Sequence, residues 1–283
     1  MSAMLIDGKA LSARFREEIA TDAQSFEKRT GRKIGLAVIL VGEDPASQVY
    51  VRNKVKACEQ TGVASYGYYL PKESTTEDVL ELVNALNEDE KVDGLLVQLP
   101  LPKHIDEKRV LSAVSPLKDV DGFHAVNAGN LLLGNECLSA CTPSGIMELI
   151  ATTGVDLCGK NAVVIGRSNI VGKPVALMLL SKNATVTVCH SRTQNLKEIT
   201  RNADVLVVAI GKKEFVTGDM IKPGAVVIDV GMNRDEGKLY GDVNFAEAKE
   251  VASYITPVPG GVGPMTITML LKNTVKAANF GQK

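Results

Sequence analysis

A tyrosine and a lysine four residues apart are the first pair of side chains that could do chemistry. Tyr50 and Lys54 lie in a segment that begins with Asp44, an expected N-cap, and Pro45, an expected first helical residue. Because a spacing of four places both side chains on one helical face, an aromatic ring lies beside an amine. The pair suits a flat, partly polar substrate, although a solvated lysine beside a half-buried tyrosine is the more common arrangement.

An amide and two carboxylates are the next candidates. Gln98 follows an apolar run in the expected strand 93–99, where a side-chain amide needs hydrogen-bond partners. It falls at the strand end near which the helix of Tyr50 begins, and a satisfied core amide is an equally good interpretation. Asp119 and Asp121 precede Gly122, and a turn role is more common than catalysis for such acids.

The segment 163–174 has the pattern of a strand, a glycine turn and the start of a helix. Gly166 would let the backbone approach a phosphate, and the N–H groups of a helix N-terminus favour an anion. Ser168 stands where the usual dinucleotide motif has its second glycine. An ordinary tight turn explains the pattern equally well.

The end of the next strand favours NADP over NAD. An NAD site usually has an acidic residue about 20 residues after the glycine turn, and the segment 189–193 has none. Arg167, Ser191 and Arg192 could instead bind a 2′-phosphate through charge-assisted hydrogen bonds. A solvated Arg192 and turn or cap roles for Ser168 and Ser191 are the alternatives.

Composition excludes several classes of protein. The chain has 283 residues, 45% of them apolar, and a net charge of −1, which allows two modest domains or one large one. No basic run indicates nucleic-acid binding, no stretch is apolar enough for a membrane span, and the first residues lack a secretion signal. Five cysteines without a close pair and three scattered histidines indicate reduced thiols and no metal site. We therefore expect a cytoplasmic protein.

Strands alternate with helices in two runs, which predicts an α/β protein with parallel sheets. We expect two lobes flanking a cleft, the second a Rossmann-type sheet. The first domain is predicted at 1–140 with the last helix at 264–283, and the second at 141–263. Residues 115–134, punctuated by proline and glycine, are expected to form a crossing region rather than core. The expected strands are 34–41, 65–70, 93–99, 161–165, 185–189, 204–209, 225–230 and 254–256, and the expected helices are 10–28, 45–61, 76–87, 142–153, 171–182, 195–201 and 265–280.

Together these pieces resemble one family, that of bifunctional methylenetetrahydrofolate dehydrogenase/methenyltetrahydrofolate cyclohydrolase. The resemblance runs from about Leu5 through the last helix. The motifs that carry it are 41–47 with Tyr50 and Lys54, then 94–102, 118–122, 141–145, 166–168 with 171–174, and 257–266. The resemblance implies oxidation of 5,10-methylenetetrahydrofolate by NADP⁺, hydrolysis of the methenyl product to 10-formyltetrahydrofolate, and a place in one-carbon metabolism and purine biosynthesis. It also implies a homodimer.

The resemblance assigns roles to single residues. Tyr50 would stack on the folate, and Lys54 would be the principal catalytic group for hydrolysis. Gln98 would hydrogen-bond Lys54, and Asp121 would bind the polar edge of the pterin. Further substrate-binding positions would be Leu99, Pro259, Gly260 and Gly261. The cofactor-contacting positions would be Gly166, Arg167, Ser168, Ser191 and Met232.

Two rival functions use the same residues less completely. An NADP-dependent reductase of another small carbonyl compound would leave Tyr50 and the strand at 94–102 without a purpose. A nucleotide-sensing binding protein would not need a lysine and a glutamine that converge on one site.

Overall fold

The computed structural model describes residues 2–280, which form two compact units. The first, the lysine unit, comprises residues 13–141 and the end of the last helix from Ile267. The second, the glycine-turn unit, comprises the start of the chain to Ser12 and residues 142–266. Both units combine helices with a parallel sheet, so the predicted α/β fold class is confirmed.

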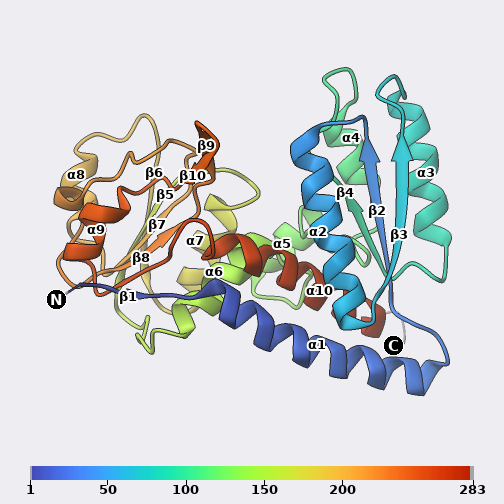
Figure 1. The fold of residues 1–283 in the computed structure, drawn as a ribbon, viewed down its shortest axis with the longest axis horizontal. Helices are drawn as coiled ribbons and strands as arrows, with labels where there is room; N and C mark the ends of the chain where they lie inside the picture. Colours follow the sequence, from blue (N-terminus) through green and yellow to red (C-terminus); the bar gives the residue numbers. More distant parts are fainter. Residues whose placement is uncertain (1, 281–283) are drawn as a thin grey trace. The chain divides into compact units, whose positions relative to one another are not determined.

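The sheet of the lysine unit has three parallel strands in the order β3-β2-β4. These are β3 (Ala64–Leu70), β2 (Gly35–Val41) and β4 (Gly94–Val97), and every residue of the central strand is buried. Alternate residues of β2, among them Ile39, pack with Val79 and Val83 of α3 (Thr76–Glu88) and with Val110 of α4 (Glu107–Ala113). Helix α2 (Pro45–Thr61) packs against β2 and β3 (Figure 1).

Helix α2 begins and ends where the sequence predicts. The Asp44 side chain accepts a hydrogen bond from Ser47 N at 2.8 Å, Pro45 occupies the first turn, and Gly62 ends the helix with φ of 75°. The chain leaves β2 at its carboxyl end and enters α2 within a few residues. Tyr50 and Lys54 therefore lie in the part of α2 that follows this end of the sheet.

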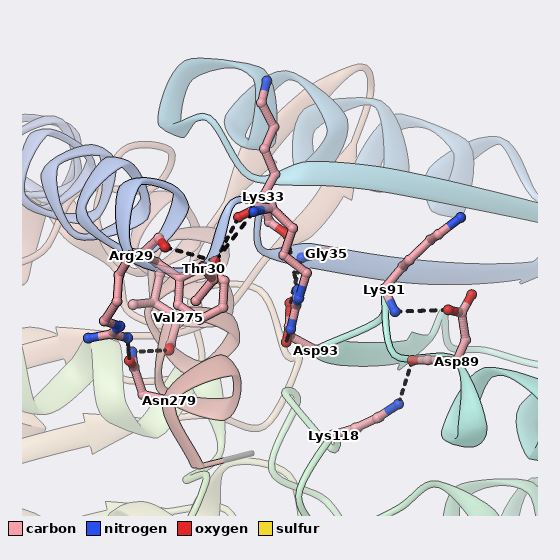
Figure 2. A network of polar contacts seen from close by, with 12 residues as sticks. Arg29, Thr30, Lys33, Gly35, Asp89, Lys91, Asp93, Lys118, Val275 and Asn279 are labelled. Atoms are coloured by element: carbon pink, nitrogen blue, oxygen red, sulfur yellow. Dashed lines mark hydrogen bonds and ion pairs between the residues drawn. The ribbon is translucent and has the colours of Figure 1, made fainter. Parts of the chain in front are cut away.

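The opposite end of the sheet is held by charged side chains (Figure 2). Arg32 donates two hydrogen bonds of 2.8 Å to the buried carboxylate of Asp93, which also accepts from Gly35 N at 2.9 Å. Lys118 Nζ donates to the carbonyl of Asp89 at 2.9 Å, just beyond α3. Since Leu95 N donates to Lys118 O at 2.7 Å, the segment that follows Lys118 starts from a fixed point beside β4.

The glycine-turn unit contains a six-stranded parallel sheet in the order β1-β11-β8-β7-β5-β6, a Rossmann-type arrangement. The strands are β1 (Met4–Leu5), β11 (Tyr254–Ile255), β8 (Val226–Asp229), β7 (Val205–Val208), β5 (Asn161–Ile165) and β6 (Thr185–Cys189). The other elements are α6 (Cys141–Ala151), α7 (Gly172–Ser181), α8 (Leu196–Thr200), the 3₁₀ turn Gly218–Met220, the hairpin β9 (Asn233–Asp235) and β10 (Lys238–Tyr240), and α9 (Phe245–Val251). Helices α1 (Gly8–Thr30) and α10 (Val262–Phe280) contribute residues to both units.

The structure differs from the predicted organisation in two places. Residues 2–12 belong to the glycine-turn unit because Met4 pairs with Tyr254 in the sheet, whereas the sequence placed them in the first domain. The region 115–134, expected as a crossing region, contains helix α5 (Ala125–Leu133). The His124 side chain accepts from Val126 N at its start and Gly134 ends it, so local capping forms a helix there.

Several predicted boundaries also shift by one to three residues. Strand β4 ends at Val97 rather than at residue 99, with one more backbone bond from Gln98 N to Ile39 O at 2.8 Å. The last helix begins at Val262 rather than at Met265. The short strand β1, helix α4, the hairpin and helix α9 were not predicted, because their apolar patterns are too brief to show a period.

Candidate active site

A direct hydrogen bond joins the two polar candidates of the lysine unit. Lys54 Nζ donates to Gln98 Oε1 at 2.9 Å, and Gln98 Nε2 donates to Leu99 O at 2.7 Å. Because a carbonyl only accepts, the second bond fixes the amide so that its oxygen faces the lysine. Gln98 thus holds the amine without bringing a charge to it.

Lys54 is buried, with 7% of its surface exposed, and burial lowers the pKa of its amine. Asp121, Cys141 and Cys58 act in the opposite direction but do not outweigh burial. A lysine in water has a pKa near ~10.4 and is a poor base at neutral pH. The shift brings Lys54 closer to the range in which an amine exchanges protons with a substrate.

Asp119 and Asp121, two residues apart, have different roles. The Asp119 carboxylate accepts hydrogen bonds from Phe123 N, His124 N and Asn127 Nδ2, so it is the turn residue of this segment. Burial raises the pKa of Asp121 to about 6, opposed by Lys54 and reinforced by Asp119. A carboxyl group tuned in this way beside a buried lysine is typical of a functional site rather than of a solvated turn.

Tyr50 lies one helical turn before Lys54 and is half-buried. Burial raises the pKa of its phenol, which keeps the ring neutral at physiological pH. A neutral aromatic ring with one wet end is a suitable surface for a flat ligand. The lysine unit therefore brings Tyr50, Lys54, Gln98, Leu99 and Asp121 to neighbouring positions on α2, the end of β4 and the segment after Lys118.

The glycine-turn unit holds the predicted nucleotide motif. Gly166 directly follows β5 with φ of 126°, and a Cβ there would collide with Ala209 O of the neighbouring strand end. A Cβ at Gly172, the first residue of α7, would collide with Gly166 O. Both positions need glycine because backbone segments cross closely, which is the geometry that lets a main chain approach a phosphate.

The side chains predicted to contact the cofactor lie on the surface of this unit. Arg167, Ser168 and Ser191 are exposed, as is Arg192. The Ser168 hydroxyl accepts from Val171 N at 3.2 Å and from Gly172 N at 3.3 Å, so it satisfies two N–H groups at the start of α7, where the N-cap residue Val171 offers no side-chain acceptor. The cap role, one of the two interpretations left open by the sequence, is therefore present.

The remaining predicted residues also belong to the glycine-turn unit. Met232 follows β8 and is 47% exposed. The turn that contains Pro259, Gly260 and Gly261 is closed by a bond from Gly261 N to the carbonyl two residues before Pro259 at 2.9 Å. Lys9 N donates to Gly260 O at 3.1 Å, which attaches the turn to the start of α1.

A buried thiol beside the lysine site was not singled out from the sequence. Cys141 Sγ donates to Val120 O at 3.1 Å, and burial raises the pKa of this thiol well above its usual range. The thiol is therefore a neutral hydrogen-bond donor and not a nucleophile. Cys141 stands within a family motif, 141–145, and that motif was the signal that could have found it.

The lysine unit also has a cavity of about 690 Å³, which lies at the carboxyl ends of β2 and β3. Arg52, Tyr69, Lys72 and Glu73 are among its lining residues, and neither Lys54 nor Asp121 is. We place the chemistry at Lys54 because a buried, hydrogen-bonded amine and a carboxyl group of raised pKa act on each other there.

All five cysteines are free thiols. Between residues 2 and 280, no group of three or more His, Cys, Asp or Glu side chains could hold a metal ion. Over the same residues, no helix has the length and apolar character that a membrane crossing requires.

Comparisons with known proteins match both units. The catalytic-domain model of tetrahydrofolate dehydrogenase/cyclohydrolase matches residues 6–121, and its NAD(P)-binding-domain model matches residues 140–282. The bifunctional protein FolD of Acetivibrio thermocellus is 58% identical over 284 residues, covering 100% of this chain and 99% of that protein.

Two solved structures extend the likeness to three dimensions. The bifunctional enzyme FolD of Campylobacter jejuni has a TM-score of 0.97 at 52% identity, covering 99% of this chain and 100% of that one. The FolD of Trypanosoma brucei, complexed with NADP cofactor and inhibitor, has a TM-score of 0.96 at 42% identity, covering 100% and 99%.

A Rossmann-type unit with a glycine turn and an α/β unit in which a buried lysine bonds a glutamine define a two-unit enzyme of the NAD(P)-binding class. The chain belongs to the tetrahydrofolate dehydrogenase/cyclohydrolase family. The resemblance drawn from the sequence motifs is thereby confirmed.

Proposed function

We propose that the protein carries out two successive reactions on a folate. The first transfers a hydride from 5,10-methylenetetrahydrofolate to NADP⁺ and leaves the 5,10-methenyl cation. The second adds water to that cation and gives 10-formyltetrahydrofolate and a proton. We assign folate binding and catalysis to the lysine unit, and cofactor binding to the glycine-turn unit. Membership of the family and the Lys54–Gln98 pair support this assignment.

Lys54 is the acid/base group of hydrolysis in this proposal. Its amine takes a proton from the water that attacks the cationic carbon. It then returns a proton to the ring nitrogen as the bond between that nitrogen and carbon breaks, while the hydroxyl proton leaves as the formyl carbonyl forms. The lowered pKa of Lys54 and the fixed orientation of Gln98 both favour proton exchange at Nζ.

The other residues of the lysine unit bind and orient the folate. Tyr50 stacks on the ring system, and the Asp121 carboxylate accepts hydrogen bonds from the polar edge of the pterin. Leu99, whose carbonyl accepts a hydrogen bond from the Gln98 side chain, contacts the same substrate. Pro259, Gly260 and Gly261, which the glycine-turn unit carries, are proposed to line the substrate position as well.

NADP⁺, when bound, supplies the hydride acceptor, and the protein's task is to orient it. The tight backbone at Gly166 and Gly172 fits a pyrophosphate group at the start of α7. We propose that Arg167 and Ser191, which are exposed, receive a 2′-phosphate, with Ser168 and Met232 as further contacts. The dehydrogenase step needs these contacts and the stacked folate, but no proton relay through Lys54.

The observation that carries the proposal is the hydrogen bond from the buried Lys54 to Gln98 in a chain of this family. The test mixes the protein with methylenetetrahydrofolate and NADP⁺ and follows the absorbance of reduced cofactor and methenyl product. Hydrolysis is measured separately, starting from the methenyl compound. Activity in the first assay without the second would restrict the proposal to a dehydrogenase, and inactivity in both would refute it.

Assembly and location complete the proposal. We propose a homodimer, as the resemblance implies. Strands β3 and β6 stand at the ends of their sheets, where backbone groups are available for pairing with a second copy. Sedimentation equilibrium tests the dimer, and a single species of 30.2 kDa would contradict it. A cytoplasmic location stays a prediction, which fractionation of cells that make the protein would test.

A further inference from the structure

We propose that Asn273 of α10 is a positioning residue that sets the main chain of Asp121 for folate recognition. The inference rests on the proposed function, because it assigns Asp121 to the pterin. Asn273 lies more than 150 positions from Asp121 in the sequence, yet both belong to the lysine unit. No sequence motif pointed to it.

The Asn273 side chain donates to two carbonyls from separate segments. Its Nδ2 lies 2.8 Å from Val120 O and 2.8 Å from Ser139 O. The same nitrogen is 3.6 Å from the sulfur of Cys141, which itself donates to Val120 O at 3.1 Å. The carbonyl directly before Asp121 therefore receives two side-chain donors.

Close packing holds the same two segments together beyond these bonds. Gly122 has φ of 74°, and a Cβ there would collide with Ser139 and Ala140. Val120 is fully buried and Ala140 is 2% exposed, so water cannot replace a lost donor at this place without opening the packing. Asn273 thus fastens the residue before Asp121 to the segment that leads into Cys141, and the close packing of Gly122 holds the residue after it against the same segment.

Asp119 fixes the other side of the segment. Its carboxylate binds the N–H groups of Phe123 and His124, as described above. Asp121 is therefore flanked by a carbonyl held from α10 and by a turn held from Asp119. Its own carboxyl group lies close enough to Lys54 for each group to shift the pKa of the other.

The arrangement makes Asn273 act through Asp121 and not on the substrate. If its donors are lost, the peptide before Asp121 can rotate, and the carboxylate moves from the position that meets the pterin edge. Misplacement of a binding group by about 1 Å can cost up to ~10²-fold. We expect Asn273→Leu to raise the folate KM at least about tenfold in both reactions, with a smaller change in kcat and none in the KM for NADP⁺.

The decisive measurement is a double-mutant cycle between Asn273→Leu and Asp121→Ala. If Asn273 acts through Asp121, its substitution should raise the folate KM less than about twofold when Asp121 is already alanine. Asn273→Gln keeps the amide donors on a longer side chain and should raise the folate KM less than Asn273→Leu does. It also provides a second variant if the leucine variant does not fold.

Two matched controls lie on the same helix. Lys276→Met removes a bond to Cys137 O at 2.9 Å, and Asn279→Ala removes a bond to Arg29, so both disturb α10 without touching Val120. Both should leave the folate KM unchanged. Equal losses in these controls, or additive losses in the double-mutant cycle, would overturn the inference. Wild-type protein inactive in both folate assays would instead refute the proposed function, which separates the two failures.

Discussion

The two units present their candidate residues in opposite ways. In the lysine unit the functional groups are buried or half-buried and are held by bonds within the protein, as for Lys54 and Gln98. In the glycine-turn unit the backbone is fixed by close glycine contacts, while Arg167 and Ser191 are exposed. The lysine unit controls the protonation of its own groups, and the glycine-turn unit provides a surface for a cofactor that brings its own chemistry.

The contrast follows from what each unit must do. An amine becomes a useful base near neutral pH only if its charged form is disfavoured, and burial does this for Lys54. A phosphate needs accessible cations and N–H groups, which burial would remove. Substitutions in the lysine unit should therefore remove chemistry or folate affinity, and those in the glycine-turn unit should change cofactor affinity and selectivity.

The largest expected effect comes from Lys54→Met. The variant keeps a long apolar side chain in the buried site but cannot exchange a proton. Hydrolysis should fall by at least ~10²-fold, the low end for one acid/base group, while hydride transfer falls far less. The two rates are measured separately, the second from the methenyl compound. Equal losses in both reactions, with folding and folate binding intact, would make Lys54 a shared binding residue.

Asp121→Ala should weaken folate use in both reactions and leave NADP⁺ binding nearly unchanged. Hydrogen bonds to a charged group contribute about 1.5–3 kcal/mol each, so the folate affinity should fall about tenfold or more. Titration of a folate analogue against the variant measures this loss. An unchanged affinity would show that Asp121 only shapes the turn, as Asp119 does.

The pH dependence of folate affinity should report the same carboxyl group. Burial raises the pKa of Asp121 to about 6, so its carboxylate is protonated progressively as the pH falls from 7 to 5. Folate affinity should fall in that window by up to about tenfold per pH unit below 6. Asp121→Asn, which does not titrate, should remove this dependence, and a wild-type affinity that is flat between pH 5 and 7 would contradict the assignment.

The same shift affects stability with the opposite sign. The folded state holds the Asp121 proton more tightly than the unfolded chain does. This group therefore contributes most to the free energy of unfolding below its ordinary pKa of 3.8, and the contribution is lost as the pH rises to about 6. Ionised Asp121 thus favours folate binding at the upper end of the range between about pH 4 and pH 7, whereas its contribution to stability is greatest at the lower end.

The sequence predicted the elements that carry the site better than the connections that hold it. The bounds of α2, β5 and β6 match the prediction, because strong caps and apolar alternation mark them. The bond between Lys54 and Gln98 was implied by family resemblance alone. Asn273 could not be found, because a helix residue that caps a distant carbonyl leaves no local pattern.

Arg167→Ala tests the glycine-turn unit and should change cofactor preference by less than the lysine-unit variants change hydrolysis or folate affinity. The loss of one charge-assisted contact costs about 1.5–3 kcal/mol at most, and exposure to solvent reduces this toward the lower bound. The preference for NADP⁺ over NAD⁺ should therefore fall by roughly tenfold, with little change in hydrolysis. The ratio of kcat/KM for the two cofactors measures it. A wild-type protein without preference would remove the basis for the assignment of Arg167 and Ser191.

The smallest expected effect concerns Ser168 of the glycine-turn unit, whose side chain is exposed but also makes hydrogen bonds within the protein. Its hydroxyl accepts hydrogen bonds from Val171 N and Gly172 N at the start of α7, and such a hydrogen bond contributes about 0.5–1.5 kcal/mol. Ser168→Ala should therefore lower the free energy of unfolding by that amount in a denaturant titration. Ser168→Asp keeps a capping acceptor and should restore stability.

The aspartate variant also decides how directly Ser168 contacts the cofactor. The carboxylate of the variant would repel a bound pyrophosphate if the side chain at position 168 lies against the cofactor. The carboxylate and the pyrophosphate would also compete for the same N–H groups at the start of α7. A stable Ser168→Asp variant that loses NADP⁺ affinity therefore places the hydroxyl at the cofactor. A stable variant with unchanged NADP⁺ affinity would show that Ser168 only stabilises the start of α7. The glycine-turn unit would then bind its cofactor through its backbone, Arg167 and Ser191.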